Sequence, residues 1–266
     1  MSQEQEWKPY PRAGYNPIYH LVGVALRLFF RLYARWKVVG LENVARTGGL
    51  LLAANHASYL DPPLLGAALY GYRRLWIMAK AELWQSRLMA FLCDRCMGFP
   101  IRRHSADRAT LRRVLDWLAQ GEAVAMFPEG ERTRDGLLHP ALPGIALLAQ
   151  KSGVPVVPVA ILGTYEMLPA NRKSIRRVPI TIAFGKPLRF GPDAAREEIT
   201  TAVMDAIAAL MTANGRPTSP PTPAVGSREP QAASTEGAAG QTVAGQDARI
   251  ERNAAVQPTN RGSGRR

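Results

Sequence analysis

Six short runs of apolar and β-branched residues alternate with stretches of helical periodicity along the first 214 residues. Runs of this length are typical of strands that are buried in a sheet. Because a crossover helix is the usual connection between parallel strands, the alternation favours an α/β fold. We predict a mixed, largely parallel sheet flanked by helices, with strands at residues 36–40, 49–54, 75–79, 123–127, 154–161 and 180–185.

Two later helices are indicated by spacing and by their ends. Residues 105–121 carry leucine or valine at 111, 114, 115 and 118, with Ser105 as a possible N-cap and Gly121 as the stop. Residues 192–211 form the second helical pattern. We therefore place the folded domain at residues 36–214.

The N-terminal segment, residues 1–35, contains a different kind of helix. Residues 18–37 carry Arg27, Arg31 and Arg35 four residues apart, with aliphatic and aromatic residues between them. The apolar stretch before Arg27 is far shorter than the roughly 20 residues that span a bilayer. We expect an amphipathic helix in the interface of an anionic membrane, although a helix packed on the domain fits the same pattern. The polar start of the chain shows no signal peptide, so we expect a peripheral or monotopic protein on the cytoplasmic face of the cell membrane.

Charge and composition limit the partners. The formal net charge is +13, which favours anionic partners, but no recognisable nucleic-acid module accompanies it, so we expect no nucleic acid. Residues 215–266 lack leucine, methionine and aromatic residues, and we expect a disordered tail. Cys93 and Cys96 form one isolated C-x-x-C pair, too little for a zinc site. We expect neither a metal nor a cofactor.

The stretch "AANHASYLDPP", residues 53–63, places polar residues directly after a strand. Ligands of α/β sheets bind outside the carboxyl ends of strands, where Asn55, His56 and Ser58 fall. On a continuous helix His56 and Asp61 would point roughly 140° apart, so they can meet only if the chain turns between them. A strand-to-helix loop would supply that turn and let Asp61 orient an imidazole that acts as a base. From spacing alone, a helix cap beside a loop histidine is equally compatible.

Three further stretches could contribute to a site. Arg102 and Arg103 in "MGFPIRR" could bind a phosphate, or form part of a solvated basic surface. In "FPEGERTRDG", Glu129 could accept a hydrogen bond from a substrate hydroxyl, Gly130 permits close backbone approach, and Arg132 adds a cation. An ordinary turn is the alternative reading there.

Two prolines interrupt the strand "VPVVPVAI", residues 154–161. Because proline cannot donate to a sheet ladder, Pro155 and Pro158 indicate a sheet edge, a strand entry or a bulge. Something else would pack at such a position. An acyl chain against Pro158 is one interpretation and a purely structural irregularity is the other.

These stretches, in order, resemble the four motifs of the glycerolipid acyltransferases, the 1-acylglycerol-3-phosphate acyltransferase-like family. The residues are "NHASYLD" (55–61), "GFPIRR" (98–103), "FPEGERT" (127–133) and "VPVVPVAI" (154–161). The resemblance implies transfer of an acyl group from acyl-CoA or acyl carrier protein to a lysophospholipid acceptor, lysophosphatidic acid, with phosphatidic acid as product. It also implies His56 as general base, Asp61 as its orienter, and Arg102, Glu129 and Gly130 as the acceptor site.

Two residues depart from that family pattern. Glu131 stands where a small hydroxyl residue is usual, and Pro143 stands before Gly144 where a basic residue is usual. Both departures bear on the identity of the acceptor more than on the type of reaction.

The chemistry of the residues is compatible with this reaction. An imidazole can remove the proton of an alcohol as it attacks a thioester. No serine or cysteine occupies a nucleophile elbow, so we expect direct transfer, with the oxyanion held by Asn55 or by amides of the following helix. A thioester hydrolase and a basic membrane-binding protein without activity are the rival interpretations.

Overall fold

The computed structural model describes residues 16–101, 108–169 and 174–216. Arg102, Arg103 and Ser105 lie outside the described residues, and so does the predicted tail apart from Gly215 and Arg216. The phosphate role predicted for Arg102 and Arg103 therefore stays a prediction.

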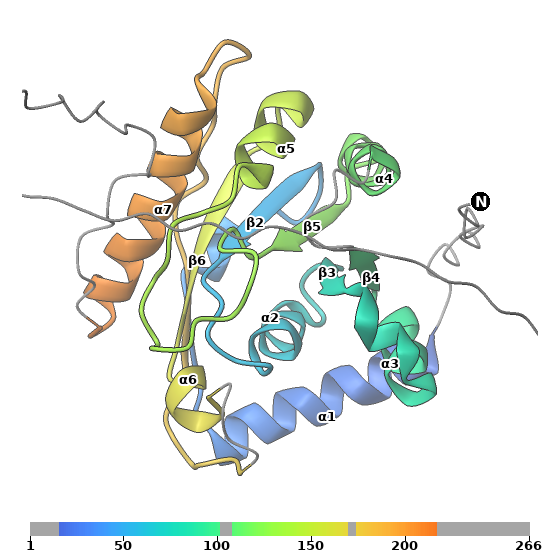
Figure 1. The fold of residues 1–266 in the computed structure, drawn as a ribbon. Helices are drawn as coiled ribbons and strands as arrows, with labels where there is room; N and C mark the ends of the chain where they lie inside the picture. Colours follow the sequence, from blue (N-terminus) through green and yellow to red (C-terminus); the bar gives the residue numbers. More distant parts are fainter. Residues whose placement is uncertain (1–15, 102–107, 170–173, 217–266) are drawn as a thin grey trace, which may run out of the picture. The chain divides into compact units, whose positions relative to one another are not determined.

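A seven-stranded sheet forms the centre of the domain (Figure 1). Its strand order is β1-β7-β6-β2-β5-β3-β4, and every pair is parallel except β6 with β7. The predicted mixed, largely parallel sheet is thus confirmed. The strands are β1 Lys37–Val39, β2 Leu50–Ala54, β3 Trp76–Lys80, β4 Gly98–Ile101, β5 Ala123–Met126, β6 Val156–Leu162 and β7 Thr181–Phe184.

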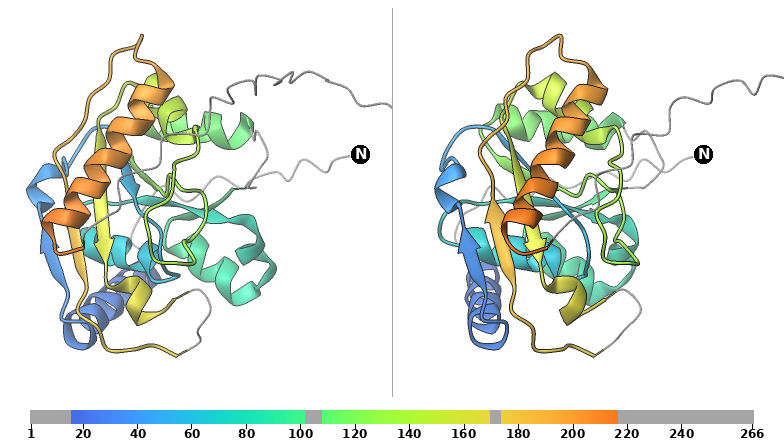
Figure 2. Two further views of the ribbon diagram at one scale, coloured as in Figure 1. Left: turned by 60° about the vertical axis from the view of Figure 1, so that its left-hand side comes forward. Right: turned by 90° about the vertical axis from the view of Figure 1, so that its left-hand side faces the viewer.

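Helices cover both faces of the sheet (Figures 1 and 2). Alternation along β2 explains the two layers, since Leu50, Leu52 and Ala54 join one apolar cluster and the residues between them join the other. The first cluster lies against α1 and α2, and the second against α4, α5 and α7. The helices are α1 Pro17–Tyr33, α2 Asp61–Leu69, α3 Arg87–Arg95, α4 Arg108–Ala119, α5 Gly144–Ser152, α6 Thr164–Met167 and α7 Arg196–Ala213, with 3₁₀ turns η1 Leu41–Asn43 and η2 Ala81–Gln85.

Strand β6 lies inside the sheet, between β7 and β2, so the edge interpretation is wrong. Pro155 directly precedes the first residue of β6, which fits the strand-entry interpretation, and Pro158 lies within the strand. The bulge interpretation holds, because two residues of β6 between Val156 and Val159 face three residues of the partner between Phe184 and Leu188. At this interruption the Pro158 carbonyl accepts a hydrogen bond from the Gly185 amide. Because proline has no N–H, a bulge at this position avoids leaving a carbonyl of the neighbouring strand without a donor.

Helix α1 ends at Tyr33, four residues earlier than predicted. Asn16 caps it by accepting from the amides of Ile18 and Tyr19, and Phe30 is buried against the domain. The helix is therefore packed on the domain, while its outer side stays exposed. Within the described ranges, no helix is both long and apolar enough to cross a membrane.

Candidate active site

The loop between β2 and α2 brings His56 and Asp61 together. The His56 Nδ1 atom lies 2.9 Å from Asp61 Oδ2. The same carboxylate oxygen accepts from the amides of Ala57 and Ser58, at 2.6 and 2.7 Å. Asp61 is thus the first residue of α2 and also the residue that folds the preceding loop back on itself. The chain therefore turns between His56 and Asp61, as it must for the two side chains to meet.

The imidazole of His56 lies at the edge of a cavity. Its ring stacks on Phe127, with ring centroids 4.1 Å apart and an interplanar angle of 20°. His56 itself lines the cavity, and its side chain is only 11% exposed. Because Nδ1 is engaged with Asp61, Nε2 is the nitrogen that remains for a substrate.

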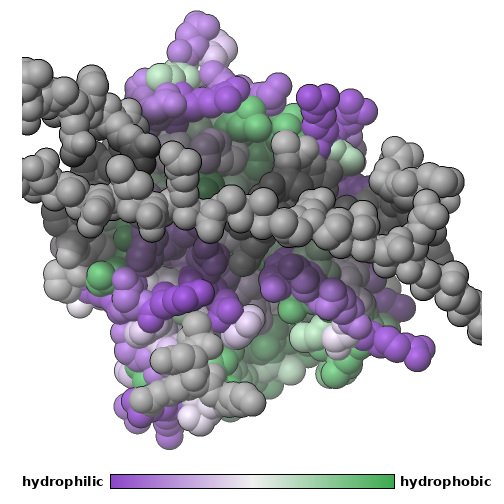
Figure 3. Space-filling model, in the orientation of Figure 1, coloured by the Kyte–Doolittle hydropathy of each residue, from purple (hydrophilic) through white to green (hydrophobic). Residues whose placement is uncertain are grey.

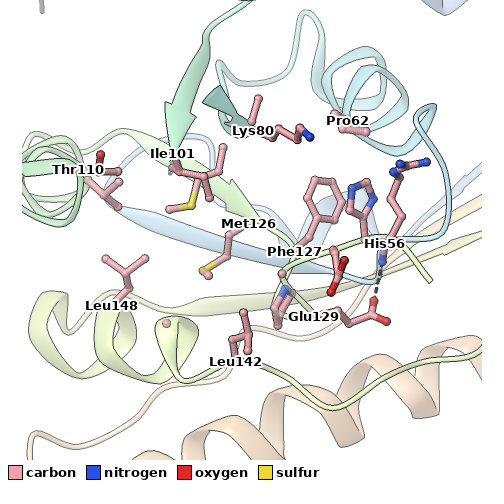
Figure 4. Close-up of a pocket in the computed structure, with 18 of the residues that line it drawn as sticks. His56, Pro62, Lys80, Ile101, Thr110, Met126, Phe127, Glu129, Leu142 and Leu148 are labelled. Atoms are coloured by element: carbon pink, nitrogen blue, oxygen red, sulfur yellow. Dashed lines mark hydrogen bonds between the residues drawn. The ribbon is translucent and has the colours of Figure 1, made fainter. Parts of the chain in front are cut away.

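Glu129 holds the backbone that carries His56. Its Oε1 accepts from the His56 amide at 2.7 Å, the contact dashed in Figure 4, and its Oε2 accepts from the His139 amide at 2.9 Å. Burial raises the pKa of Glu129 to about 7, against the two backbone hydrogen bonds and His139, which lower it. Each carboxylate oxygen thus accepts one hydrogen bond within the protein, and Glu129 also lines the cavity, so its acceptance from a substrate hydroxyl stays a prediction.

The loop after Glu129 fixes the other backbone group of His56. The Thr133 amide donates to the His56 carbonyl at 2.9 Å. The Thr133 hydroxyl donates to Asp135, which also accepts from the Leu137 amide and pairs with His139 Nε2 at 2.9 Å. The Thr133 hydroxyl and these neighbours hold the pKa of Asp135 below its ordinary value. This network was not predicted from the sequence, although the T-x-D-G spacing of residues 133–136 is typical of hydrogen-bonded turns.

The cavity beside His56 has a volume of about 560 Å³ and two unlike parts. His56, Phe127 and Glu129 lie at one side, and Ile101, Thr110 and Leu148 lie toward the other (Figure 4). Apolar side chains from β5, α4 and α5 dominate the far part: Leu111, Val114, Met126, Leu147 and Leu148. Four charged side chains line the cavity as well: Lys80, Arg108, Glu131 and Arg132. This lining suits a substrate with an apolar chain and a charged head group.

Three predicted site residues turn away from this cavity. The Asn55 side chain donates to the Ile161 carbonyl and accepts from the Ile161 amide, at 3.0 and 2.7 Å. The Ser58 hydroxyl donates to the Leu168 carbonyl at 2.7 Å. Pro158 is buried in β6 and is not among the cavity-lining residues. These three residues hold the loop and the sheet together and do not face the cavity.

The predicted oxyanion donors need a related correction. The Asn55 side chain pairs with the Ile161 backbone through both its nitrogen and its oxygen, and Asn55 is not among the residues that line the cavity. The amides of Ala57 and Ser58 are directed at Asp61, and α2 continues with Pro62 and Pro63, which have no N–H. Neither predicted source of donors is therefore open to the cavity.

Gly130 and Arg132 lie at the cavity as predicted. Gly130 has φ of 77°, a backbone conformation that favours glycine, and a Cβ atom there would lie 2.4 Å from Leu142 Cδ1. The Arg132 guanidinium lies 3.5 Å above the Tyr59 ring, and its buried Nη1 has no hydrogen-bond partner in the described part of the chain. Of the two departures from the motif, Glu131 lines the cavity and Pro143 precedes α5 without lining it.

Metal binding finds no support in the described ranges. Among residues 16–101, 108–169 and 174–216, no group of three histidine, cysteine or acidic side chains could hold a metal ion. Cys93 and Cys96 are free thiols, and burial together with Cys93 raises the pKa of Cys96 to about 11.

Comparison with known proteins bears directly on this site. A family described as Acyltransferase matches residues 35–162, which include the His56–Asp61 loop, Glu129 and β6. The crystal structure of the 1-acyl-sn-glycerophosphate acyltransferase PlsC from Thermotoga maritima has a TM-score of 0.63 and 26% identity, covering 76% of this chain and 80% of that one. The chain contains a domain of the acyltransferase family.

Relatives of this acyltransferase carry two kinds of name. The 1-acyl-sn-glycerol-3-phosphate acyltransferase of Bacillus subtilis is 27% identical over 64% of this chain and 82% of its own length. The lyso-ornithine lipid O-acyltransferase of Pseudomonas aeruginosa is 35% identical over 42% of each chain. The chain spans only 40% of the Brassica napus chloroplast relative, at 28% identity. The predicted resemblance and the enzyme class are confirmed.

Proposed function

We propose that this acyltransferase moves a fatty acyl group from acyl-CoA or acyl carrier protein to the free hydroxyl of 1-acylglycerol-3-phosphate, giving phosphatidic acid. The observation that carries the proposal is the buried His56–Asp61 pair, 2.9 Å apart, at the edge of a largely apolar cavity. The relatives named for this acceptor support it. We also infer that the enzyme works as a peripheral protein at the cytoplasmic face of the membrane.

The proposed reaction needs one base and no covalent enzyme intermediate. In the neutral imidazole, donation from Nδ1–H to Asp61 leaves Nε2 without a proton. Nε2 then takes the proton of the acceptor hydroxyl as the hydroxyl oxygen attacks the thioester carbonyl. The tetrahedral intermediate then expels the thiolate, the C–S bond breaks, and the imidazolium returns a proton to the sulfur. The glycerol oxygen keeps the acyl group as a new ester. His56 is unchanged at the end of the cycle.

The two parts of the cavity correspond to the two parts of the substrates. The apolar lining from α4, β5 and α5 suits an acyl chain. Arg132, with a buried nitrogen that lacks a partner in the described part of the chain, suits a phosphate oxygen. Glu129 and Thr133 would act as positioning residues that hold His56 by its backbone.

A second acceptor class is favoured by Glu131. This carboxylate lines the cavity next to Arg132, where a cationic group of a lysolipid head could pair with it. A relative named for lyso-ornithine lipid is 35% identical over 113 residues. A zwitterionic lysolipid, with one negative and one positive group, would meet both side chains.

A panel of acceptors with one radiolabelled acyl-CoA tests these proposals. We expect label in phosphatidic acid when 1-acylglycerol-3-phosphate is added, and a loss of at least about 10²-fold in turnover for His56→Ala. Preferred labelling of a zwitterionic lysolipid would select the second acceptor class. Release of free fatty acid at the same rate without any acceptor would identify a hydrolase, and label bound to the denatured protein would identify an acyl-enzyme.

A further inference from the structure

Exposed apolar side chains gather on two helices and one loop of the domain. In the described part of the chain, eleven large hydrophobic side chains are exposed, and eight of them lie on α1, on α3 or at Ile175. We call these eight the apolar band: Leu21, Val24, Leu28, Leu32, Leu88, Met89, Phe91 and Ile175. Leu21, Leu32 and Leu88 are 70%, 68% and 66% exposed, so the domain core does not use them.

The three segments of the band adjoin one another. At the start of α1, Asn16 Nδ2 donates to the Arg95 carbonyl at the end of α3, at 3.0 Å. At the end of α1, the Tyr33 hydroxyl donates to the Ile175 carbonyl at 3.3 Å. Figures 1 and 2 show α1, α3 and the chain that follows α6 along the lower end of the domain in each view. The three segments are therefore neighbours in space, although Leu21 and Ile175 are about 150 residues apart in the sequence.

Helix α3 contributes no fully buried residue to the core. None of its residues is buried, although Leu88, Met89 and Phe91 are apolar. In Figure 3 hydrophobic residues reach the surface at the lower right, where Figure 1 places α3, with hydrophilic residues beside them. Ala90, Leu92 and Cys93 are half-buried against the domain, so the inner side of α3 packs on it while the large apolar side chains of its outer side stay exposed. An amphipathic helix with such an exposed apolar side is typical of one that contacts a membrane or a partner.

The charges beside the band select an anionic surface. Seven arginines lie in the same three segments: Arg27, Arg31, Arg35, Arg87, Arg95, Arg176 and Arg177. In the described ranges none of them forms a salt bridge. The one carboxylate in these segments, Asp94, accepts from Trp84 Nε1 at 2.8 Å. Apolar side chains flanked by cations fit the interface of a bilayer that contains anionic lipid.

The apolar band also lies near the cavity. Leu83 of η2 lines the cavity, and α3 begins two residues after η2 ends. A lipid substrate in a bilayer at the band is thus next to the side of the cavity that η2 forms. We propose that α3 and the loop at Ile175 enter the lipid interface together with α1, as one docking surface that places the cavity beside the bilayer. This rests on the proposed membrane association.

Vesicle flotation of the full-length protein tests the docking surface. The vesicles contain phosphatidylcholine with or without phosphatidylglycerol, and the variants are Leu88→Ser on α3, Ile175→Ser and Leu28→Ser on α1. Leu137→Ser is the matched control, because Leu137 is 49% exposed and lies outside the band. We expect each band variant to lower the partition coefficient by about tenfold and the control to leave it unchanged.

The activity assay separates this inference from the proposed function. With an acceptor below its critical micelle concentration, we expect Leu88→Ser to transfer the acyl group at the same rate as the unaltered protein. With the same acceptor in vesicles, we expect the variant to transfer it more slowly. Absence of transfer by the unaltered protein with dispersed substrates would contradict the proposed function, whereas flotation would still report on the band.

Two outcomes would overturn the inference. Normal flotation of Leu88→Ser and Ile175→Ser, beside a loss for Leu28→Ser, would confine docking to α1. Self-association that Leu88→Ser abolishes, with flotation unchanged, would assign the face to a second copy of the chain.

Discussion

His56 is fixed through its ring and through both of its backbone groups. Asp61 binds Nδ1, Glu129 binds the amide, Thr133 binds the carbonyl, and Phe127 stacks on the ring. A base must be held within hydrogen-bond reach of the proton it removes, so each of these contacts bears on the rate.

Replacement of Asp61 by asparagine tests the orienting role. The amide of Asp61→Asn can no longer stabilise an imidazolium and can present a donor to Nδ1, which favours the wrong tautomer. We expect kcat to fall by at least about 10²-fold with little change in the acceptor KM. Stopped-time assays with radiolabelled donor measure both constants. An unchanged kcat would contradict the assignment.

Glu129 predicts a pH dependence of stability. Its pKa is raised from 4.5 to about 7 in the folded protein, so between these values the folded state holds the proton more tightly than the unfolded state. The free energy of unfolding that Glu129 contributes is therefore highest below pH 4.5 and falls as the pH rises to about 7. Over this pH range, the free energy of unfolding falls by an amount of the order of 3 kcal/mol because of Glu129.

Urea denaturation of the protein and of Glu129→Gln measures this effect. Glutamine keeps the shape but does not titrate. We expect the stability of the unaltered protein, relative to the variant, to decrease from below pH 4.5 to above pH 7. A difference that stays constant with pH would show that Glu129 does not carry the shifted pKa.

At the scale of elements, α4 and α5 form the wall of the apolar part of the cavity. Leu111 and Leu115, one turn apart on α4, are both half-buried against the core, but only Leu111 lines the cavity. The wall is therefore the part of the molecule that limits the room for an acyl chain.

A larger side chain on this wall should change the choice of donor. We expect Leu111→Trp to lower kcat/KM for long-chain acyl donors by about tenfold or more, with a smaller effect on short ones, because the added ring occupies cavity volume. A series of acyl-CoA chain lengths measures this. Leu115→Trp is the control, and an equal loss for every chain length would contradict the prediction.

At the scale of the whole molecule, net charge determines the approach to a surface. The chain carries +13, and three arginines lie on or next to α1. We expect binding to anionic vesicles to weaken as salt rises, since the Debye length falls from about 10 Å at 0.1 M to about 3 Å at 1 M. Cosedimentation across a salt series measures it. Binding that ignores ionic strength would mean that the apolar side chains act alone.

Local sequence determined the class of fold. All six predicted strands occur within one or two residues of their predicted bounds, because burial and β-branching act over a few neighbouring residues. The six predicted strands do not include β4, and α3 was not predicted either. The four motifs were sufficient to predict the acyltransferase family.

Only the tertiary structure decided what each polar side chain of those motifs binds. Asn55 pairs with Ile161, 106 residues away, and Ser58 with Leu168, 110 residues away, so neither faces the cavity. Glu129 binds the His56 amide from 73 residues away and thus holds the base. Hydrogen-bond partners so distant along the chain leave no periodicity or spacing in the sequence, whereas the strands that bring them together do.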